Sequence, residues 1–226
     1  MARRQSRNRQ DERDSGQRGG SLLRVPRTRA EWVAEGRVWL KSIIIVLLIF
    51  IPLVTFVVQG YRIPSRSMED TLLVGDFLFA DKFTFGARVP FTNETRLPGI
   101  REPEPGDIVI FKSPETGENL IKRVVAVGGQ TVEMRRKELY VDDRRLDEPY
   151  VKHSSRMYVP RRDDFPKRIV PSGSIFCLGD NRDESRDSRF YGFVPLRLVI
   201  AKADVIYFSF DTKKFLPRIG RIAKTL

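Results

Sequence analysis

The sequence predicts an all-β fold: an antiparallel β-sheet or barrel-like exported domain, preceded by one N-terminal transmembrane helix. Short runs rich in β-branched residues follow one another after residue 60, and Gly and Pro residues separate them. No long repeat of 3.6 residues interrupts these runs. Strands at this spacing indicate a sandwich or a barrel. A chain of 226 residues has room for one such domain and an anchor.

The first 36 residues are predicted to form a basic, disordered cytoplasmic tail. The chain has a formal net charge of +12, and residues 1–41 contain eleven Lys or Arg against five Asp or Glu, a net of +6. Residues 1–20 have almost no apolar side chains, so they cannot bury enough surface to offset the entropy lost on ordering. A basic segment suits nucleic acid or an anionic membrane. The apolar run that follows favours the membrane, so no nucleic-acid partner is expected.

One apolar run predicts a membrane anchor over residues 37–60. Ser42–Gly60 is nineteen residues long and has no charge. At 1.5 Å per residue it reaches about 28 Å, close to the ~30 Å hydrocarbon core of a bilayer. A buried globular helix is rarely apolar on every face, and the apolar core of a cleaved signal is shorter, about 7–15 residues. Because basic flanks stay in the cytoplasm, the residues after the run are expected to face outward.

The exported domain is predicted over residues 61–211, with a basic and apolar tail over residues 212–226. Its strongest strand signals are Asp107–Phe111, Leu120–Val127, Thr131–Met134, Glu138–Val141, Ile175–Leu178 and Val199–Phe210. Residues 86–105 and 152–173 are predicted to be loops. The tail either lies on an anionic membrane surface or is solvated. Four phenylalanines are either strand residues of the core or a patch that contacts lipid: Phe77, Phe79, Phe83 and Phe85.

Histidine and cysteine are too few for the commonest catalytic sites. The chain has one cysteine, Cys177, and one histidine, His153, which excludes an intrachain disulfide and a zinc ligand set. A Ser-His-Asp triad would need His153, which lies in a polar stretch and is predicted to be a surface residue. A serine nucleophile in this chain would therefore need a lysine or a carboxylate as its base.

Ser67 follows the apolar run, and Lys122 is the candidate base. Serine is a weak nucleophile until a base removes its proton. A lysine can do so only when neutral, and burial in apolar surroundings lowers its pKa. Lys122 lies among apolar residues, namely Leu120, Ile121 and Val124–Val127. Because strands alternate faces, the pattern favours a lysine that points to solvent, with Arg123 on the opposite face, and leaves both interpretations open.

A third stretch is densely charged. Gly179–Gly192 contains seven charged residues in fourteen positions and follows an apolar strand. It is either a surface loop or a polar network in which Asp–Arg pairs brace a site.

Four motifs behind the apolar run resemble those of bacterial type I signal peptidases, the membrane-bound serine proteases that remove signal peptides from exported proteins. The resemblance covers residues 40 to about 211 and rests on Ser65-Arg66-Ser67-Met68 with Thr71-Leu72, Pro105–Phe111, Ile121–Val125 and Gly179–Arg189. One motif alone is weak evidence, whereas four in the family's order are specific.

The resemblance implies a serine endopeptidase with a Ser-Lys dyad, in which Ser67 is the nucleophile and Lys122 the general base. Ser65 matches the serine whose hydroxyl joins the Ser67 N–H in the oxyanion hole. Ser185 matches the serine that orients the lysine amine. The residues that match the bracing positions of the last motif are Asp180, Asn181, Asp187 and Arg189, with Gly179 at its start. The family needs no metal or cofactor.

The resemblance also implies the partners and the location. Family substrates are preproteins with small residues at the first and third positions before the cut, and family members contact membrane lipids. We therefore expect a single-pass protein of the cytoplasmic membrane with its N-terminus inside. Two residues depart from the family pattern. Arg66 replaces a small residue between the serines, and Asp70 stands where proline is frequent, which puts in doubt the contacts with substrate after the cut and the rigidity of the turn.

Three other functions stay open at this point. A membrane-tethered, non-enzymatic binding module with a lipid- or nucleic-acid-contacting tail has no use for a serine–lysine pair. Self-cleaving repressor proteases resemble the chain around the serine and lysine, but they carry a DNA-binding domain that residues 1–41 do not suggest. A catalytically dead relative is expected to have lost Ser67 or Lys122, and both are present.

Overall fold

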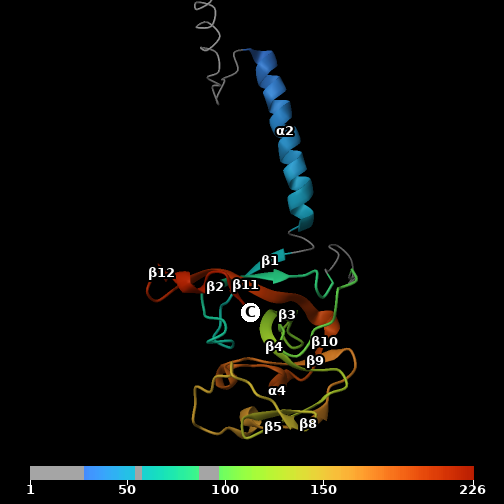
Figure 1. Ribbon diagram of the computed structural model, residues 1–226, viewed down its shortest axis with the longest axis vertical. Helices are drawn as coiled ribbons and strands as arrows, with labels where there is room; N and C mark the ends of the chain where they lie inside the picture. The colour runs from blue at the N-terminus through green and yellow to red at the C-terminus, as the bar shows by residue number, and fades with distance from the viewer. Residues whose placement is uncertain (1–27, 54–57, 87–96) are drawn as a thin grey trace, which may run out of the picture. The chain divides into compact units, whose positions relative to one another are not determined.

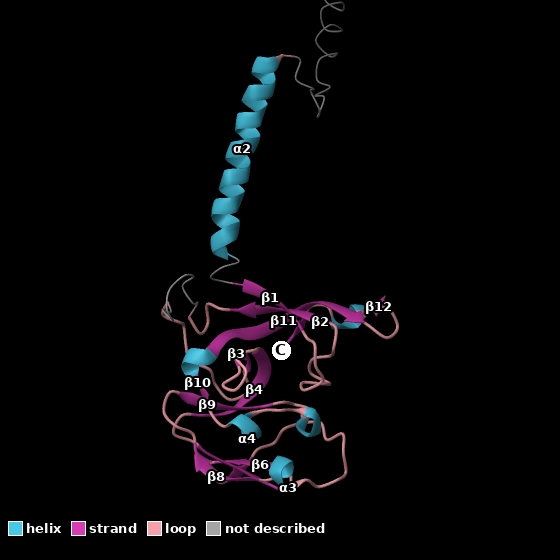
Figure 2. Cartoon of the chain, turned by 180° about the vertical axis from the view of Figure 1, so that it is seen from behind, coloured by secondary structure: helices cyan, strands magenta, loops and turns pink. Residues whose placement is uncertain are grey.

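The computed structural model describes residues 28–53, 58–86 and 97–226. They belong to two compact units, Met1–Ile49 and Phe50–Leu226, which we describe separately. The second unit is mainly antiparallel β-sheet, as predicted (Figure 1, Figure 2). The predicted tail over residues 1–27 lies outside the described residues.

Helix α2 covers Arg29–Pro52. Residues 29–36 are therefore helical, although the sequence predicted them as part of a disordered tail. All the side chains of α2 that the structure describes are exposed, and many of them are large and apolar, including Ile43 and Phe50. In the described part of the chain, no helix combines the length and the apolar character needed to cross a membrane.

The predicted anchor is wrong at its C-terminal end. Val58–Arg62 forms strand β1, which pairs with β2 from Val58 opposite Asp81 to Arg62 opposite Phe77. The main-chain groups of Val58–Gly60 are thus satisfied in a sheet ladder rather than in a helix. The apolar residues of this segment fitted both a helix and a strand, because a short apolar run has no distinguishing period.

Two antiparallel sheets make up the second unit. The larger has nine strands in the described residues, in the order β1-β2-β11-β3-β4-β9-β10, with β12 and β13 also pairing with β11. Its further strands are β2 (Asp76–Asp81), β3 (Ile108–Lys112), β4 (Asn119–Val127), β9 (Ser174–Leu178), β10 (Val194–Pro195), β11 (Val199–Asp211), β12 (Leu216–Pro217) and β13 (Lys224–Thr225). The smaller sheet has the order β7-β6-β5-β8 and contains β5 (Thr131–Arg135), β6 (Glu138–Val141), β7 (Arg144–Arg145) and β8 (Phe165–Ile169).

Strand β11 bends the larger sheet. It is 13 residues long and pairs with β2 and with β3, and its register shifts in both ladders. Such bulges bend a strand and increase its twist. The larger sheet consequently curls into a half-barrel, visible around β11 and β3 in Figure 1.

The two sheets share an apolar core. Buried side chains of β4 and β9 pack against those of β5, β6 and β8 in one cluster. Phe165 of β8 and Phe176 of β9 meet in it, with ring centroids 4.9 Å apart. A second cluster contains Ile63, Met68 and Leu72 together with side chains of β2, β3 and β11. This second cluster matters for function because it contains residues on both sides of Ser67.

All the predicted strands listed above are confirmed, with end shifts of one residue, and β5 and β6 form the expected hairpin. The prediction of a loop over residues 152–173 is wrong. The segment contains the short helix α3 (Pro160–Asp163) and β8, which pairs with β5. Only Phe165 of β8 is buried, and Pro166 suits its position at the sheet edge. A strand with one apolar contact leaves no alternating pattern in the sequence. Of the other predicted loop, residues 87–96 lie outside the described residues.

Residues 212–226 are attached to the large sheet rather than extended as a solvated tail or a surface helix. Strands β12 and β13 pair with β11, and the single-turn 3₁₀ helix η4 (Ile219–Arg221) lies between them. Apolar side chains of this segment are nevertheless exposed, with Phe215 at 77% and Ile219 at 75%. No boundary between compact units falls at residue 211.

The four phenylalanines divide between the two interpretations. Phe85 is buried in a core cluster, and Phe77 is half-buried. Phe79 and Phe83 are exposed, and the Phe79 ring stacks on Tyr207 at a centroid distance of 4.2 Å.

Candidate active site

Ser67 lies in a turn between β1 and β2 that apolar side chains hold in place. Met68 and Leu72 are completely buried in the core, whereas Ser65 and Arg66 are exposed. The turn is closed by main-chain hydrogen bonds, including Leu72 N–H to Met68 O at 2.7 Å. Ser67 itself is 6% exposed. Burial of its neighbours thus sets the position of the Ser67 hydroxyl at the domain surface.

Lys122 reaches Ser67 from strand β4. Its side chain is buried, with the residue 3% exposed. Lys122 Nζ donates to Ser67 Oγ at 2.6 Å and to Ile121 O at 3.0 Å. The interpretation of Lys122 as a solvent-facing strand residue is therefore wrong. Strand β4 packs on both of its faces, since Val124 lies in one core cluster and Val125 in another, so alternation does not bring every second residue into water.

Burial lowers the pKa of Lys122 from 10.5 to about 8, although the negative charges of Asp187 and Asp180 oppose the change. A charged amine loses most of its hydration inside a protein, so the neutral form is favoured there. At ~1.36 kcal/mol per pKa unit, this difference corresponds to roughly 3 kcal/mol. With a pKa of about 8, about one tenth of the Lys122 side chains are uncharged at pH 7 and able to accept a proton.

Asp180 and Asn181 hold the turn that carries Ser67. Asp180 is buried and accepts two hydrogen bonds from Arg123, from Nε at 2.9 Å and from Nη2 at 2.7 Å, and one from Thr71 Oγ1 at 2.6 Å. The Asn181 N–H donates to Ser67 O at 3.1 Å, and Asn181 Nδ2 donates to the carbonyl of Arg66 at 3.2 Å. The densely charged stretch is thus a polar network that braces the turn, and not a free surface loop.

Asp187 and Arg189 form a buried ion pair behind the site. Arg189 Nε donates to Asp187 Oδ1 at 2.8 Å, and the Asp187 carboxylate also accepts the N–H of Gly179 at 3.1 Å. Arg189 further donates to the carbonyls of Arg162 and Arg182. The pair therefore ties several loop segments together beneath Lys122.

Ser185 and Ser67 both lie next to Gly179. The described residues show no hydrogen bond between Ser185 and Lys122. The Ser185 hydroxyl is buried and interacts with the carboxylate of Asp187. A Cβ atom placed on Gly179 would lie 2.5 Å from Ser67 O and still closer to Ser185 Oγ. Gly179 is therefore needed where these two segments approach each other. Ser65 Oγ lies 3.4 Å from Ser67 Oγ, on the exposed side of the turn.

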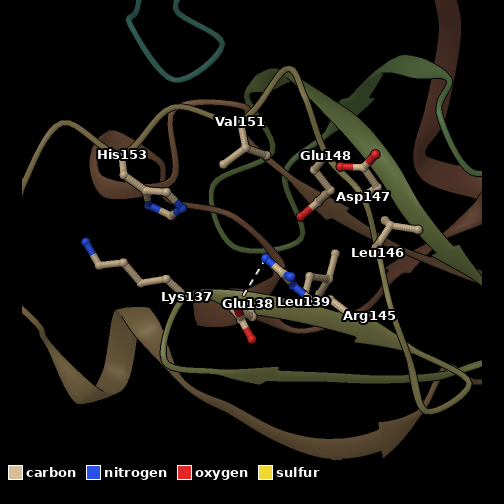
Figure 3. Close-up of a pocket in the computed structure, with 9 residues that line it drawn as sticks. All are labelled: Lys137, Glu138, Leu139, Arg145, Leu146, Asp147, Glu148, Val151 and His153. Carbon is tan, nitrogen blue, oxygen red and sulfur yellow. Dashed lines mark ion pairs between the residues drawn. The ribbon is translucent and has the colours of Figure 1, made fainter.

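His153 makes no described contact with Ser67 or Lys122. Its side chain is 35% exposed, and Nδ1 lies 4.0 Å from Asp183. It lines a cavity of about 550 Å³ on the small sheet, together with Lys137, Arg145 and Glu148 (Figure 3). None of the predicted site residues lines this cavity. His153 therefore remains a surface residue, as predicted.

The backbone conformation at residue 70 explains why this chain has aspartate where proline is frequent in the family. The φ of Asp70 is +78°, in the left-handed region, which proline cannot adopt. Its carboxylate accepts a hydrogen bond from Lys152 Nζ at 3.1 Å. The exposed Arg66 side chain extends from the same turn.

The sequence assigns no role to three residues of the network. Thr71 occurs only within a motif, Arg123 is expected only on the strand face opposite Lys122, and Glu148 lies in no motif. Glu148 accepts two hydrogen bonds from Arg182, which is buried beside the site. The available signal was a polar residue inside or next to an apolar run, and that signal does not identify the partner. Within the described residues, no group of three or more His, Cys, Asp or Glu is arranged to hold a metal ion.

A serine hydroxyl next to a buried lysine amine is the arrangement expected of a serine hydrolase with a lysine base. Comparisons with known proteins define the class further. The family model described as "Signal peptidase, peptidase S26" matches residues 36–208. The signal peptidase I of Pseudomonas aeruginosa is 34% identical over 218 aligned residues, which cover 80% of this chain and 76% of the relative.

Two further relatives agree. The signal peptidase I of Aquifex aeolicus is 31% identical and covers 72% of this chain and 80% of its own. That of Haemophilus influenzae is 27% identical and covers 91% of this chain and 79% of its own. The chain belongs to the signal peptidase family, peptidase S26. It is a serine peptidase that cleaves signal peptides, which excludes the non-enzymatic binding module.

The buried amine of Lys122 is expected to reduce stability. The pKa of Lys122 is about 8 in the folded chain and 10.5 in the unfolded chain. Between these two pH values the folded state therefore binds fewer protons than the unfolded state, so the free energy of unfolding rises with pH. The cost of burying Lys122 is greatest below pH 8 and is lost by pH 10.5. Lys122→Met should raise the free energy of unfolding at pH 7 by about 1–3 kcal/mol and remove that rise with pH.

Urea unfolding of the detergent-solubilised chain, followed by circular dichroism, measures both effects. Lys112→Met, at an exposed position of β3, is the matched control and should leave the pH dependence unchanged. A Lys122→Met variant less stable than wild type at pH 7 would contradict a costly buried amine.

Proposed function

We propose that Ser67 is the nucleophile and Lys122 the general base in the cleavage of signal peptides, at the outer face of the cytoplasmic membrane. The observation that carries the proposal is the 2.6 Å contact between Lys122 Nζ and Ser67 Oγ, both of which belong to buried residues. This distance allows direct proton transfer. No other side chain of the described residues is positioned to take the Ser67 proton.

The proposed reaction is an acyl transfer in two halves. Neutral Lys122 accepts the Ser67 proton while Oγ attacks the scissile carbonyl carbon, and the resulting ammonium protonates the leaving amine as the C–N bond breaks. Lys122 is then neutral again. It accepts a proton from water while the water oxygen attacks the ester carbon, and the resulting ammonium protonates Ser67 Oγ as the bond between Oγ and the acyl carbon breaks and the peptide acid leaves.

The oxyanion is proposed to bind to the N–H of Ser67 and the hydroxyl of Ser65. The 3.4 Å separation of the two serine hydroxyls supports this assignment. A donor of this kind is typically worth ~2.7–4 kcal/mol in the transition state. We assign Ser185 to the orientation of the Lys122 amine when substrate is bound, because its buried hydroxyl lies beside Gly179 and next to the carboxylate of Asp187, whose charge acts on Lys122. Asp180, Asn181, Asp187 and Arg189 are assigned to bracing.

The proposed substrates have small residues at the first and third positions before the cut. Ser67 is only 6% exposed, so a large side chain next to the scissile bond would hinder the approach of the carbonyl carbon. The apolar stretch that begins at Ser42 and precedes β1 is proposed as a single membrane anchor with the N-terminus in the cytoplasm. The exposed Phe79, Phe83, Phe215 and Ile219 support additional contact with lipid.

The dyad is tested by cleavage of a preprotein with an Ala-x-Ala site. Ser67→Ala and Lys122→Ala should each lower kcat at least about 10³-fold, because each removes a group that the chemical step requires. His153→Ala should cleave at the wild-type rate. Substantial cleavage by Lys122→Ala at neutral pH would contradict the mechanism, and a large loss in His153→Ala would favour a triad.

The pH dependence tests the protonation state of the base. The reaction needs neutral Lys122, whose pKa is about 8 in the folded chain. The value of kcat/KM should therefore rise about tenfold per pH unit below pH 8 and level off above it. A peptide assay from pH 6 to 10 measures this, with His153→Gln as a control that keeps the same profile. A midpoint near 6.5 that disappears in His153→Gln would contradict the assignment.

The anchor is tested by membrane extraction. The full chain should stay in the membrane pellet after carbonate treatment, and its β domain should be digested by protease added to the outer face. A chain that starts at Val58 should be released to the supernatant, because it lacks the uncharged run. Release of the full chain by carbonate, or protection of its β domain from outside protease, would contradict the proposed location.

A further inference from the structure

A buried carboxylate lies below the nucleophile turn, on strand β2. Asp76 is completely buried and accepts hydrogen bonds from Leu73 N–H at 2.8 Å and Ser209 Oγ at 2.6 Å. Its charge is compensated by the C-terminal segment, residues 212–226. Arg221 Nη2 lies 2.6 Å from Asp76 Oδ2, and Arg218 Nη1 lies 3.7 Å from Oδ1. Burial raises the pKa of Asp76, but the hydrogen bonds from Arg221 and Ser209 outweigh it and keep the carboxyl ionised.

Arg221 also binds the nucleophile turn itself. Its Nη2 donates to the carbonyl of Thr71 at 2.8 Å. Thr71 is four residues after Ser67, and its hydroxyl donates to Asp180 Oδ2 at 2.6 Å. Thr71 is thus held from two sides, by Arg221 at its main chain and by Asp180 at its side chain. Both contacts act on the C-terminal half of the turn whose N-terminal half carries Ser67.

Hydrogen bonds connect Arg221, through Thr71 and Asp180, to strand β4, which carries Lys122. Asp180 accepts the two hydrogen bonds from Arg123, which is adjacent to Lys122 on β4. The turn therefore connects two arginines, one from the C-terminal segment and one from β4. Of these two arginines, Arg221 lies outside the family motifs quoted above, and its guanidinium bridges the carboxylate of Asp76 and the carbonyl of Thr71.

We propose that Arg221 is a positioning residue for the cleavage reaction, through which the C-terminal segment holds Ser67 in register with Lys122. This inference rests on the proposed roles of Ser67 and Lys122. The side chain has no contact with either residue, so its effect is on geometry. A displacement of the Ser67 hydroxyl by a fraction of an ångström would lengthen the 2.6 Å contact to Lys122 Nζ and slow the chemical step, whereas substrate binding along the sheet would change little.

The test uses the full, detergent-solubilised chain and a preprotein substrate. Arg221→Met keeps the length of the side chain and removes its donors, and it should lower kcat about 30-fold with a KM within about threefold of wild type. Arg221→Lys keeps the charge but reaches only one acceptor at a time, and it should lower kcat about fivefold. Arg161→Met removes an exposed arginine from α3 and should leave kcat and KM unchanged.

Folding is monitored in the same samples by circular dichroism and urea unfolding. If Arg221→Met does not fold, Arg221→Lys carries the test. A fall in kcat in a variant that is folded at the assay temperature, with KM unchanged, supports the proposal. A variant that is less stable but has wild-type kcat overturns it, and so does a rise in KM without a change in kcat.

Ser67→Ala, assayed alongside, separates this inference from the proposed function. If Ser67→Ala is inactive and Arg221 has no effect on kcat, the positioning role alone is wrong. If Ser67→Ala retains activity, the proposed nucleophile is wrong, and with it the reason for a positioning role.

Discussion

The hydrogen bond between Lys122 and Ser67, inside the protein, is the interaction on which the rest of the structure depends. A lysine amine is useful as a base only if the fold removes its water, and removing that water costs free energy. Strand β4 meets this requirement because it lies between β3 and β9 and because its neighbours cover Lys122. The turn that carries Ser67 lies against the amine, and Ile63 before Ser67 and Met68 after it are both buried in the core.

Two buried carboxylates near the amine make this environment harder to maintain. Asp180 and Asp187 both act to raise the pKa of Lys122, so unpaired they would favour the protonated, inactive amine. Each is bound by an arginine, Asp180 by Arg123 and Asp187 by Arg189. Burying two acids with two bases keeps the bracing hydrogen bonds while limiting the negative potential at Lys122. The dense charge of the 179–192 stretch thus has an electrostatic reason as well as a structural one.

Sequence reasoning identified the two central residues for a physical reason. A serine next to an apolar run and a lysine inside an apolar strand are both unusual, and the four motifs gave them roles. The residue pattern alone favoured a solvent-facing Lys122, because alternation is a rule for sheets with one wet face, and the family resemblance assigned Lys122 as the base. The long strands were predictable from their β-branched runs. Strand β8 was not predictable, because it buries only Phe165. The apolar character of Val58–Gly60 predicted the end of a helix, whereas these residues belong to β1.

The partners of the polar residues were beyond the reach of the sequence. Thr71 and Arg221 are separated by 150 positions, and Arg182 and Glu148 by 34. No local pattern indicates that such residues will meet, because the pairing follows from the curvature of the large sheet and from the packing of its loops. The C-terminal residues illustrate the point. Their basic and apolar composition fitted a surface tail, yet two of their arginines lie against a buried aspartate.

The central claim is that the amine of Lys122 is largely desolvated and titrates far below an ordinary lysine. An NMR titration of the chain labelled with ¹³C at the lysine ε-carbon measures this directly, with the Lys122 signal assigned by its absence from Lys122→Met. A midpoint near pH 8 is expected, while exposed lysines titrate at about 10.4. A Lys122 signal that titrates together with the exposed lysines would contradict the account.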